Sequence, residues 1–260
     1  MNELDDTMLN TNRPTYLTAL PVYNEVETVS SVLDLVKRHS SNILVVDDGS
    51  TDGTSELLTK RNDIDRVTHS TNRGYGAALR AAFGYAIAHD YKYVVTIDCD
   101  GQHEPQRIQH FVDVIEKTGA DIVSGSRYLE SFASDSPPPE QRRAINFQVT
   151  RILNERLGFR LSDAFCGFKA YRVKSLKSLT LTETGYAMPL ELWVQAACQK
   201  LSVHEVAVPR IYLDESRSFG GKLDDAEIRL NHYREVMNKA FAALPSDCEK
   251  LRSSGSESVG

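Results

Sequence analysis

Two aspartates stand one residue apart, directly after one of the most apolar segments of the chain. Residues 93–105 read YVVTIDCDGQHEP, with Asp98 and Asp100 behind a run of β-forming residues. Alternate residues of an extended chain point to the same side, so the two carboxylates are expected to lie together. Such a pair is costly unless a cation lies between the two groups, and oxygen ligands suit Mg2+ or Mn2+. The motif predicts a metal site that also holds phosphate oxygens; a solvated turn in which Asp98 caps the next helix is the alternative.

A second acidic segment, VVDDGSTDGT at residues 45–54, admits two interpretations. In the first, either Asp47 or Asp48 binds a ribose or a base edge, because adjacent carboxylates at a strand end repel each other and favour a polar ligand. In the second, a glycine-rich turn leads into a capped helix. The spacing also resembles the start of a calcium loop, but Thr59 stands where the bidentate glutamate belongs, so we reject that interpretation.

The motif PVYNE at residues 21–25 is polar in a way that helix capping explains only in part. Asn24 can cap a following helix, with Glu25 in its first turn. This interpretation gives no reason for Tyr23. A ligand contact is therefore kept as an equal alternative.

The motif NRGYGAAL at residues 72–79 begins like a dinucleotide-binding loop. Gly74 and Gly76 supply the first two glycines, but Leu79 stands at the position of the third, and the motif precedes the third predicted helix rather than the first. A glycine turn that opens an alanine-rich helix is the simpler interpretation.

Short apolar strands and amphipathic helices must position these motifs. The alternation predicts strands at residues 16–20, 43–46, 93–97 and 121–124, and helices at 25–39, 52–61, 75–89 and 105–118. Such an order is typical of an α/β fold with a mostly parallel, doubly wound sheet flanked by helices. Ligands of such sheets bind beyond the carboxyl ends of the strands, where the polar motifs lie.

The second half of the chain elaborates the same sheet. A proline-rich loop, SDSPPPEQRR, precedes a basic helix at 140–157, and further elements are predicted at 166–171 (strand), 189–200 (helix), 203–211 (strand) and 224–244 (helix). We therefore expect a single domain at residues 15–245, between a flexible segment at 1–14 and a disordered tail at 246–260.

Bulk composition narrows the class of protein. A net charge of -6 over 260 residues argues against a nucleic-acid partner. The four cysteines, at 99, 166, 198 and 248, form no C-x-x-C pair, which predicts a reduced, intracellular chain. The polar N-terminus is no signal peptide, and no apolar run is long enough to span a bilayer. We expect a cytoplasmic protein that meets any membrane substrate from the surface, as a peripheral protein at the inner membrane face.

In this order and spacing, PVYNE, VVDDGSTDGT, NRGYGAAL and DCDGQHEP resemble glycosyltransferase family 2 of the GT-A fold. GSRY at 125–128, DAFCGFKAYR at 163–172 and GYAMPLEL at 185–192 extend the resemblance, over about residues 16–223, to the dolichyl-phosphate mannose synthase and polyprenyl-phosphate sugar transferase branch. It implies a single GT-A domain. It also implies metal-dependent, inverting transfer of a sugar from a nucleoside diphosphate sugar, of the GDP-mannose or UDP-glucose type, to an acceptor such as a polyprenyl phosphate.

The resemblance assigns roles residue by residue. The nucleotide pocket matches Pro21, Tyr23, Glu25 and Asp48, with Asp98 also on the donor side. The Mg2+ or Mn2+ ligands match Asp98, Asp100 and Gln102. The acceptor-phosphate arginines match Arg127 and either Arg142 or Arg143, and Arg217, in a loop at 215–223, is a candidate for the diphosphate. The expected catalytic residues are Asp100, Arg127 and Asp163.

The acceptor decides which of these groups is needed. A lipid phosphate is already ionised at neutral pH and needs positioning by guanidinium groups, such as that of Arg127. A sugar hydroxyl needs a general base, for which Asp163 is the candidate, although this residue can equally be a turn aspartate.

Two other classes of protein compete with this interpretation. A sugar nucleotidyltransferase needs a basic, glycine-rich loop after the first strand, and PVYNE is not one. A non-catalytic sugar-nucleotide binding module is expected to have lost a carboxylate, whereas Asp98 and Asp100 are both present. One departure from the branch is Cys99, since its members usually read D-A-D-L-Q-H; we expect Cys99 to be a small core residue.

Overall fold

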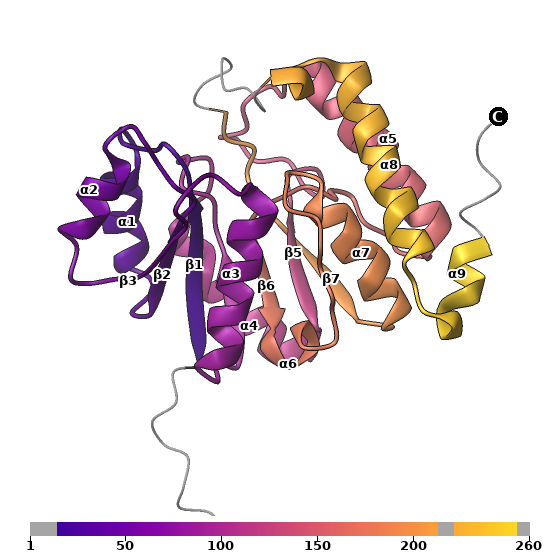
Figure 1. The fold of residues 1–260 in the computed structure, drawn as a ribbon, viewed down its shortest axis with the longest axis horizontal. Coiled ribbons are helices and arrows are strands. Elements are labelled where there is room, and N and C mark those ends of the chain that lie inside the picture. The colour runs from indigo at the N-terminus through magenta and orange to yellow at the C-terminus, as the bar shows by residue number, and fades with distance from the viewer. Residues whose placement is uncertain (1–14, 213–220, 254–260) are drawn as a thin grey trace, which may run out of the picture.

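The computed structural model describes residues 15–212 and 221–253, which form a seven-stranded sheet between two layers of helices (Figure 1). The strand order is β3-β2-β1-β4-β6-β5-β7. The strands are β1 (Tyr16–Val22), β2 (Ile43–Asp47), β3 (Asp65–Thr68), β4 (Tyr93–Thr96), β5 (Ile122–Ser126), β6 (Lys169–Arg172) and β7 (Val203–Ala207). All pairs are parallel except those of β6, which runs antiparallel to β4 and β5. The predicted mostly parallel α/β sheet is confirmed.

The helices cover both faces of the sheet. They are α1 (Val29–Lys37), α2 (Thr54–Thr59), α3 (Tyr75–Ala88), α4 (Ile108–Thr118), α5 (Glu140–Leu157), α6 (Val173–Leu176), α7 (Met188–Cys198), α8 (Ala226–Ala242) and α9 (Glu249–Ser253), with single turns η1 (Pro105–Arg107), η2 (Gly221–Asp224) and η3 (Ser246–Cys248). Helices α1 and α4 pack on one face, and α3, α5, α7 and α8 contribute to the core on the other.

The strands are apolar throughout because both of their faces are buried. In β2, Leu44 and Val46 contact the core beneath α3, whereas Ile43 and Val45 contact the core beneath α1. Side chains alternate between the faces of a strand, so a strand covered on both sides reads as a continuous hydrophobic run. This explains why β1, β2 and β4 were recognisable in the sequence.

Two local predictions are corrected. The chain at 65–68 was not predicted to be a strand, because β3 is a half-exposed edge strand with Asp65 and Arg66 in it. The first helix was predicted from residue 25, but α1 begins at Val29. Asn24 does not cap it; its backbone φ is 54° and its Oδ1 accepts a hydrogen bond from the Thr51 amide at 2.8 Å.

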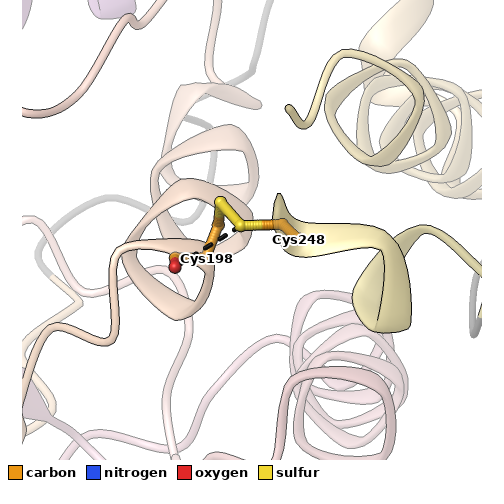
Figure 2. The surroundings of a disulfide bond; sticks show 2 residues. All are labelled: Cys198 and Cys248. Atoms are coloured by element: carbon orange, nitrogen blue, oxygen red, sulfur yellow. Dashed lines mark hydrogen bonds between the residues drawn. A yellow bond between two sulfur atoms is a disulfide. The ribbon is translucent and has the colours of Figure 1, made fainter. Parts of the chain in front are cut away.

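The C-terminal segment also differs from its prediction. Residues 246–253, expected to be disordered, form η3 and α9, and Cys248 forms a disulfide with Cys198 at the end of α7 (Figure 2). The Cα atoms lie 5.6 Å apart, although 50 positions separate the two residues in sequence. The expectation of four reduced cysteines is therefore wrong for this pair, since tertiary packing, not local spacing, brings them together.

Candidate active site

A cleft of about 670 Å³ lies at the carboxyl ends of β1, β2, β4 and β5. It gathers side chains from segments that are remote in sequence. Those predicted for the site are Pro21, Tyr23, Glu25, Asp48, Asp98, Asp100, Gln102, Arg127 and Arg142. Arg143 and Asp163 do not line it, and Arg217 lies outside the described residues.

The loop after β1 forms one wall of the cleft. The Tyr23 side chain is exposed there, which leaves its ring free to contact a planar ligand. The Glu25 carboxylate accepts a hydrogen bond from the Thr28 hydroxyl at 2.8 Å. The Asn24 backbone amide donates a hydrogen bond to the Ser50 hydroxyl, and the Asn24 side-chain oxygen accepts one from the Thr51 amide, so the loops after β1 and β2 are joined.

The two adjacent aspartates after β2 have different surroundings. The buried Asp47 carboxylate accepts hydrogen bonds from the Ser50 amide at 3.0 Å and from the Ser55 hydroxyl, and it does not line the cleft. The Asp48 carboxylate lines the cleft and accepts hydrogen bonds from the Arg73 and Gly74 amides at 3.0 and 2.7 Å. Of the two, only Asp48 can reach a ligand in the cleft.

Gly74 is required by close packing rather than by a dinucleotide. Its φ is +98°, and a Cβ atom there would lie 2.3 Å from the Thr184 carbonyl oxygen. The glycine-turn interpretation of this motif is therefore confirmed. The turn also brings Tyr75 to the cleft, where its ring stacks on that of Tyr186 with 5.6 Å between the centroids.

Asp98 is held from two sides. Strand β4 ends at Thr96, and the Asp98 carboxylate then accepts a hydrogen bond from the Tyr75 hydroxyl at 3.0 Å and lies 3.3 Å from His103 Nε2. Burial raises the pKa of Asp98, but His103 and the Tyr75 hydroxyl outweigh this effect and hold the pKa below its ordinary value. Asp98 is therefore ionised at neutral pH.

Gly167 leaves room for Asp98. A Cβ atom at Gly167 would lie 2.1 Å from an Asp98 carboxylate oxygen. The Thr96 hydroxyl donates a hydrogen bond to the Gly167 carbonyl at 2.7 Å, which fixes the end of β4 against this segment. The antiparallel pairing of β4 with β6 thus helps to set the position of the carboxylate.

Asp100 and Gln102 complete an oxygen-rich corner of the cleft. The Gln102 backbone amide donates to the Asp100 carboxylate at 2.9 Å, and both residues line the same cleft as Asp98. Two carboxylates and a side-chain amide are donors that fit Mg2+ or Mn2+. Cys99, between the aspartates, is only 2% exposed and belongs to the core, as predicted.

Arg127 is held in place by the buried carboxylate of Asp163. Its Nε and terminal nitrogen donate to the two Asp163 oxygens at 2.7 and 3.0 Å. Asp163 is fully buried and also accepts hydrogen bonds from the Asn146 side chain and the Phe165 amide. Burial raises the pKa of Asp163, but Arg127 and Asn146 hold it well below the ordinary value. This geometry suits a group that positions Arg127 better than a base that accepts a substrate proton.

The structure also separates two neighbouring arginines. Consecutive residues of a helix point about 100° apart. Accordingly, Arg142 of α5 lines the cleft, whereas Arg143 is exposed and lies over the Phe147 ring, 5.3 Å from its centroid.

Several cleft residues were missed by sequence reasoning. They are mostly aromatic, with one buried arginine: Tyr75, Tyr128, Tyr186, Tyr212, Tyr233 and Arg229. Tyr75, Tyr128 and Tyr186 stand inside recognised motifs, so a signal existed for them. No sequence signal existed for Arg229, because it stands within an ordinary predicted helix. Its guanidinium donates a hydrogen bond to the Leu223 carbonyl at 2.7 Å.

A mostly parallel sheet with one antiparallel strand, and a cleft at the strand ends lined by an Asp-x-Asp motif, define a GT-A glycosyltransferase. Residues 18–180 match the model of Glycosyl transferase family 2, and the chain belongs to this family. It is a glycosyltransferase, as the motifs predicted.

Relatives and solved structures agree with this membership. The chain is 28% identical to an undecaprenyl-phosphate mannosyltransferase of Micrococcus luteus, over 84% of the chain and 93% of the relative. It is 32% identical to a polyprenol monophosphomannose synthase of Mycolicibacterium smegmatis, over 76% and 78%. A glucosyl-3-phosphoglycerate synthase from Mycobacterium tuberculosis, solved with Mn2+ and UDP, shares the fold with a TM-score of 0.67 and 21% identity, covering 89% of this chain and 81% of that one.

Proposed function

We propose that the protein transfers a sugar from a nucleoside diphosphate sugar, of the GDP-mannose or UDP-glucose type, to a polyprenyl or dolichyl phosphate, with Mg2+ or Mn2+ and inversion at the anomeric carbon. One observation carries this proposal. The same cleft has an acidic corner at Asp98 and Asp100 and a cationic wall at Arg127 and Arg142. The first suits a metal that binds a diphosphate, and the second suits an anionic acceptor.

The donor side of the cleft is formed by lining residues that come before position 103 in the sequence. Asp98, Asp100 and Gln102 would hold the metal, and Pro21, Tyr23, Glu25 and Asp48 would contact the nucleotide. When bound, the cation would offset the negative charge that develops on the leaving diphosphate. Tyr75 and His103 keep Asp98 oriented for this role, because each contacts its carboxylate.

The acceptor side favours a phosphate over a sugar hydroxyl. A phosphate needs no general base, and Asp163, the candidate base, is already engaged by Arg127, Asn146 and a backbone amide. The bidentate contact with Asp163 fixes the Arg127 guanidinium before an acceptor arrives. Arg142 adds a second cation to the same wall.

The setting of this reaction follows from the acceptor. Within residues 15–212 and 221–253 no helix is long and apolar enough to cross a membrane. We propose that the protein acts as a cytoplasmic enzyme that meets its lipid phosphate at the inner face of the membrane. Arg217 remains a candidate diphosphate contact from the loop at 215–223.

The test is transfer of a radiolabelled sugar to polyprenyl phosphate in detergent, with a panel of GDP- and UDP-sugars. The wild-type protein should require both the lipid phosphate and Mg2+ or Mn2+. Asp100→Asn should lower turnover by at least about 100-fold, because it removes a charged metal ligand. Asp113→Asn, which changes an exposed carboxylate on α4, is the matched control and should leave turnover unchanged. Transfer without a metal, or unchanged turnover in Asp100→Asn, contradicts the metal assignment, and transfer only to a sugar hydroxyl contradicts the acceptor.

A further inference from the structure

Large apolar side chains are exposed beside the cationic wall of the cleft. Leu129 and Phe147 are 45% and 43% exposed. Leu129 follows Arg127 by two positions, and Phe147 lies about one helical turn beyond Arg143 on α5. Exposed apolar residues scattered singly need no explanation, so the question is whether these two connect to the site.

Tyr128 provides the connection between the cleft and this exposed surface. Its side chain lines the cleft, and its ring lies against that of Phe147 with 5.1 Å between the centroids. Apolar surface therefore continues from Tyr128, next to Arg127 in the cleft, to the exposed ring of Phe147 outside it. We name Tyr128 and Phe147 the aromatic exit.

Cations surround the aromatic exit. The guanidinium groups of Arg127 and Arg210 each lie 5.8 Å from the Tyr128 ring centroid, and that of Arg143 lies 5.3 Å from the Phe147 centroid. An apolar path that begins between guanidinium groups is complementary to a molecule with an anionic head and an apolar tail. The arrangement is of little use to a wholly polar acceptor.

We propose that the aromatic exit receives the first isoprene units of the lipid acceptor, whose phosphate is bound at Arg127 and Arg142. This inference rests on the proposed function. It adds that the protein recognises the isoprenoid tail of the acceptor as well as the phosphate. The occupant is the isoprenoid tail rather than a second protein chain, because the path is continuous with the phosphate-binding wall. The tail leaves the cleft over Phe147 toward the membrane.

The test is a series of water-soluble prenyl phosphates with one, two and three isoprene units, which keeps bilayer binding out of the assay. For the wild-type protein, kcat/KM should rise with the number of units. Phe147→Ser should flatten this rise, with a loss of at least about tenfold for the three-unit acceptor and little change for the one-unit acceptor. The KM of the donor should not change, and Phe147→Leu should restore most of the rise.

Leu35→Ser is the matched control. Leu35 is as exposed as Phe147, at 43%, but it lies on α1, which packs on the opposite face of the sheet. This variant should keep the wild-type rise. Phe147 is exposed, so we expect its variants to fold, and their thermal unfolding should match that of the control.

Every other outcome contradicts either the aromatic exit or the proposed function. A rise of equal steepness in wild type and Phe147→Ser, or no rise in the wild-type protein, overturns the aromatic exit while the proposed function stands. Equal loss for all three acceptors overturns it as well, because the effect would then be on the phosphate. Loss of binding to anionic vesicles without a change in the series would assign Phe147 to the bilayer or to a second copy instead. Failure of every prenyl phosphate as an acceptor would contradict the proposed function itself.

Discussion

Arg127 depends on a carboxylate that no solvent reaches. Asp163 is 0% exposed and accepts hydrogen bonds from two nitrogens of the Arg127 guanidinium. Burying an ion pair is close to neutral when the partners satisfy each other, but removing one partner leaves a buried charge uncompensated. The pair thus links the cationic wall of the cleft to the stability of the fold.

We predict that Asp163→Asn lowers the free energy of unfolding by about 3 kcal/mol at pH 7. Because the pKa of Asp163 is depressed in the folded state, its contribution is fully present above its ordinary pKa of about 4 and is lost as pH falls below that value. The difference in the free energy of unfolding between wild type and variant should therefore decrease as the pH falls below 4. Urea unfolding at several pH values between 3 and 7 measures it.

The same variant separates positioning from base catalysis. If Asp163 positions Arg127, Asp163→Asn should raise the KM of the phosphate acceptor more than that of the donor, and Asp113→Asn should change neither. A lower kcat with unchanged acceptor KM, or a stability difference that grows toward acid, would argue against a positioning role for Asp163.

At the residue scale, the sequence predicted cleft residues best where they stand in one short motif. Asp98, Asp100 and Gln102 stand within five residues of one another, so one motif could identify them. Whether Arg142 or Arg143 faces the cleft depends on the rotation of α5 about its axis. Whether Asp47 or Asp48 faces it depends on the hydrogen bonds that each carboxylate accepts. Arg229 could be assigned to the cleft only from the packing of α8, and no local sequence pattern indicates that packing.

At the scale of elements, the buried strands were predictable and the order in which they pair was not. Strands β1, β2 and β4 are hydrophobic on both faces and stand out in the sequence. Strand β6 is inserted antiparallel between β4 and β5, a pairing that depends on contacts between distant segments. The half-exposed edge strand β3 carries no such hydrophobic signal.

The disulfide joins the end of α7 to the end of η3 and is a covalent constraint on the C-terminal segment (Figure 2). It closes a loop between positions 50 apart in sequence. We predict that Cys248→Ser lowers the free energy of unfolding of the oxidised protein by roughly 2–4 kcal/mol, because the unfolded chain gains freedom. Urea unfolding with and without dithiothreitol measures this effect.

The reductant provides the control for that experiment. Dithiothreitol should bring the wild-type protein close to the variant and leave the variant unchanged. Peptide mapping without reduction should recover residues 198 and 248 in one linked fragment. Equal stability of oxidised wild type and variant would show that α9 docks without help from the bond.

Over the whole molecule, the cleft is divided along the sequence. The groups proposed for the donor come from the segments that follow β1, β2 and β4, and those proposed for the acceptor come from the segments after β5 and from α5. The buried segment that contains Asp163 and Gly167 touches both sides, since the first contacts Arg127 and the second lies against Asp98. In the proposed reaction, the two substrates are therefore expected to bind on either side of this segment.

This division predicts two separate footprints in amide hydrogen exchange. A nucleoside diphosphate with Mn2+ should slow exchange at residues 21–25, 72–75 and 98–102, because the ligand and metal order these loops. A three-unit prenyl phosphate should slow exchange at 127–129 and 142–147 instead. The far peptides of α4 serve as the control and should not respond. Protection of both sets by either ligand alone would show that the halves of the cleft close together, and protection in the reverse pattern would exchange the donor and acceptor assignments.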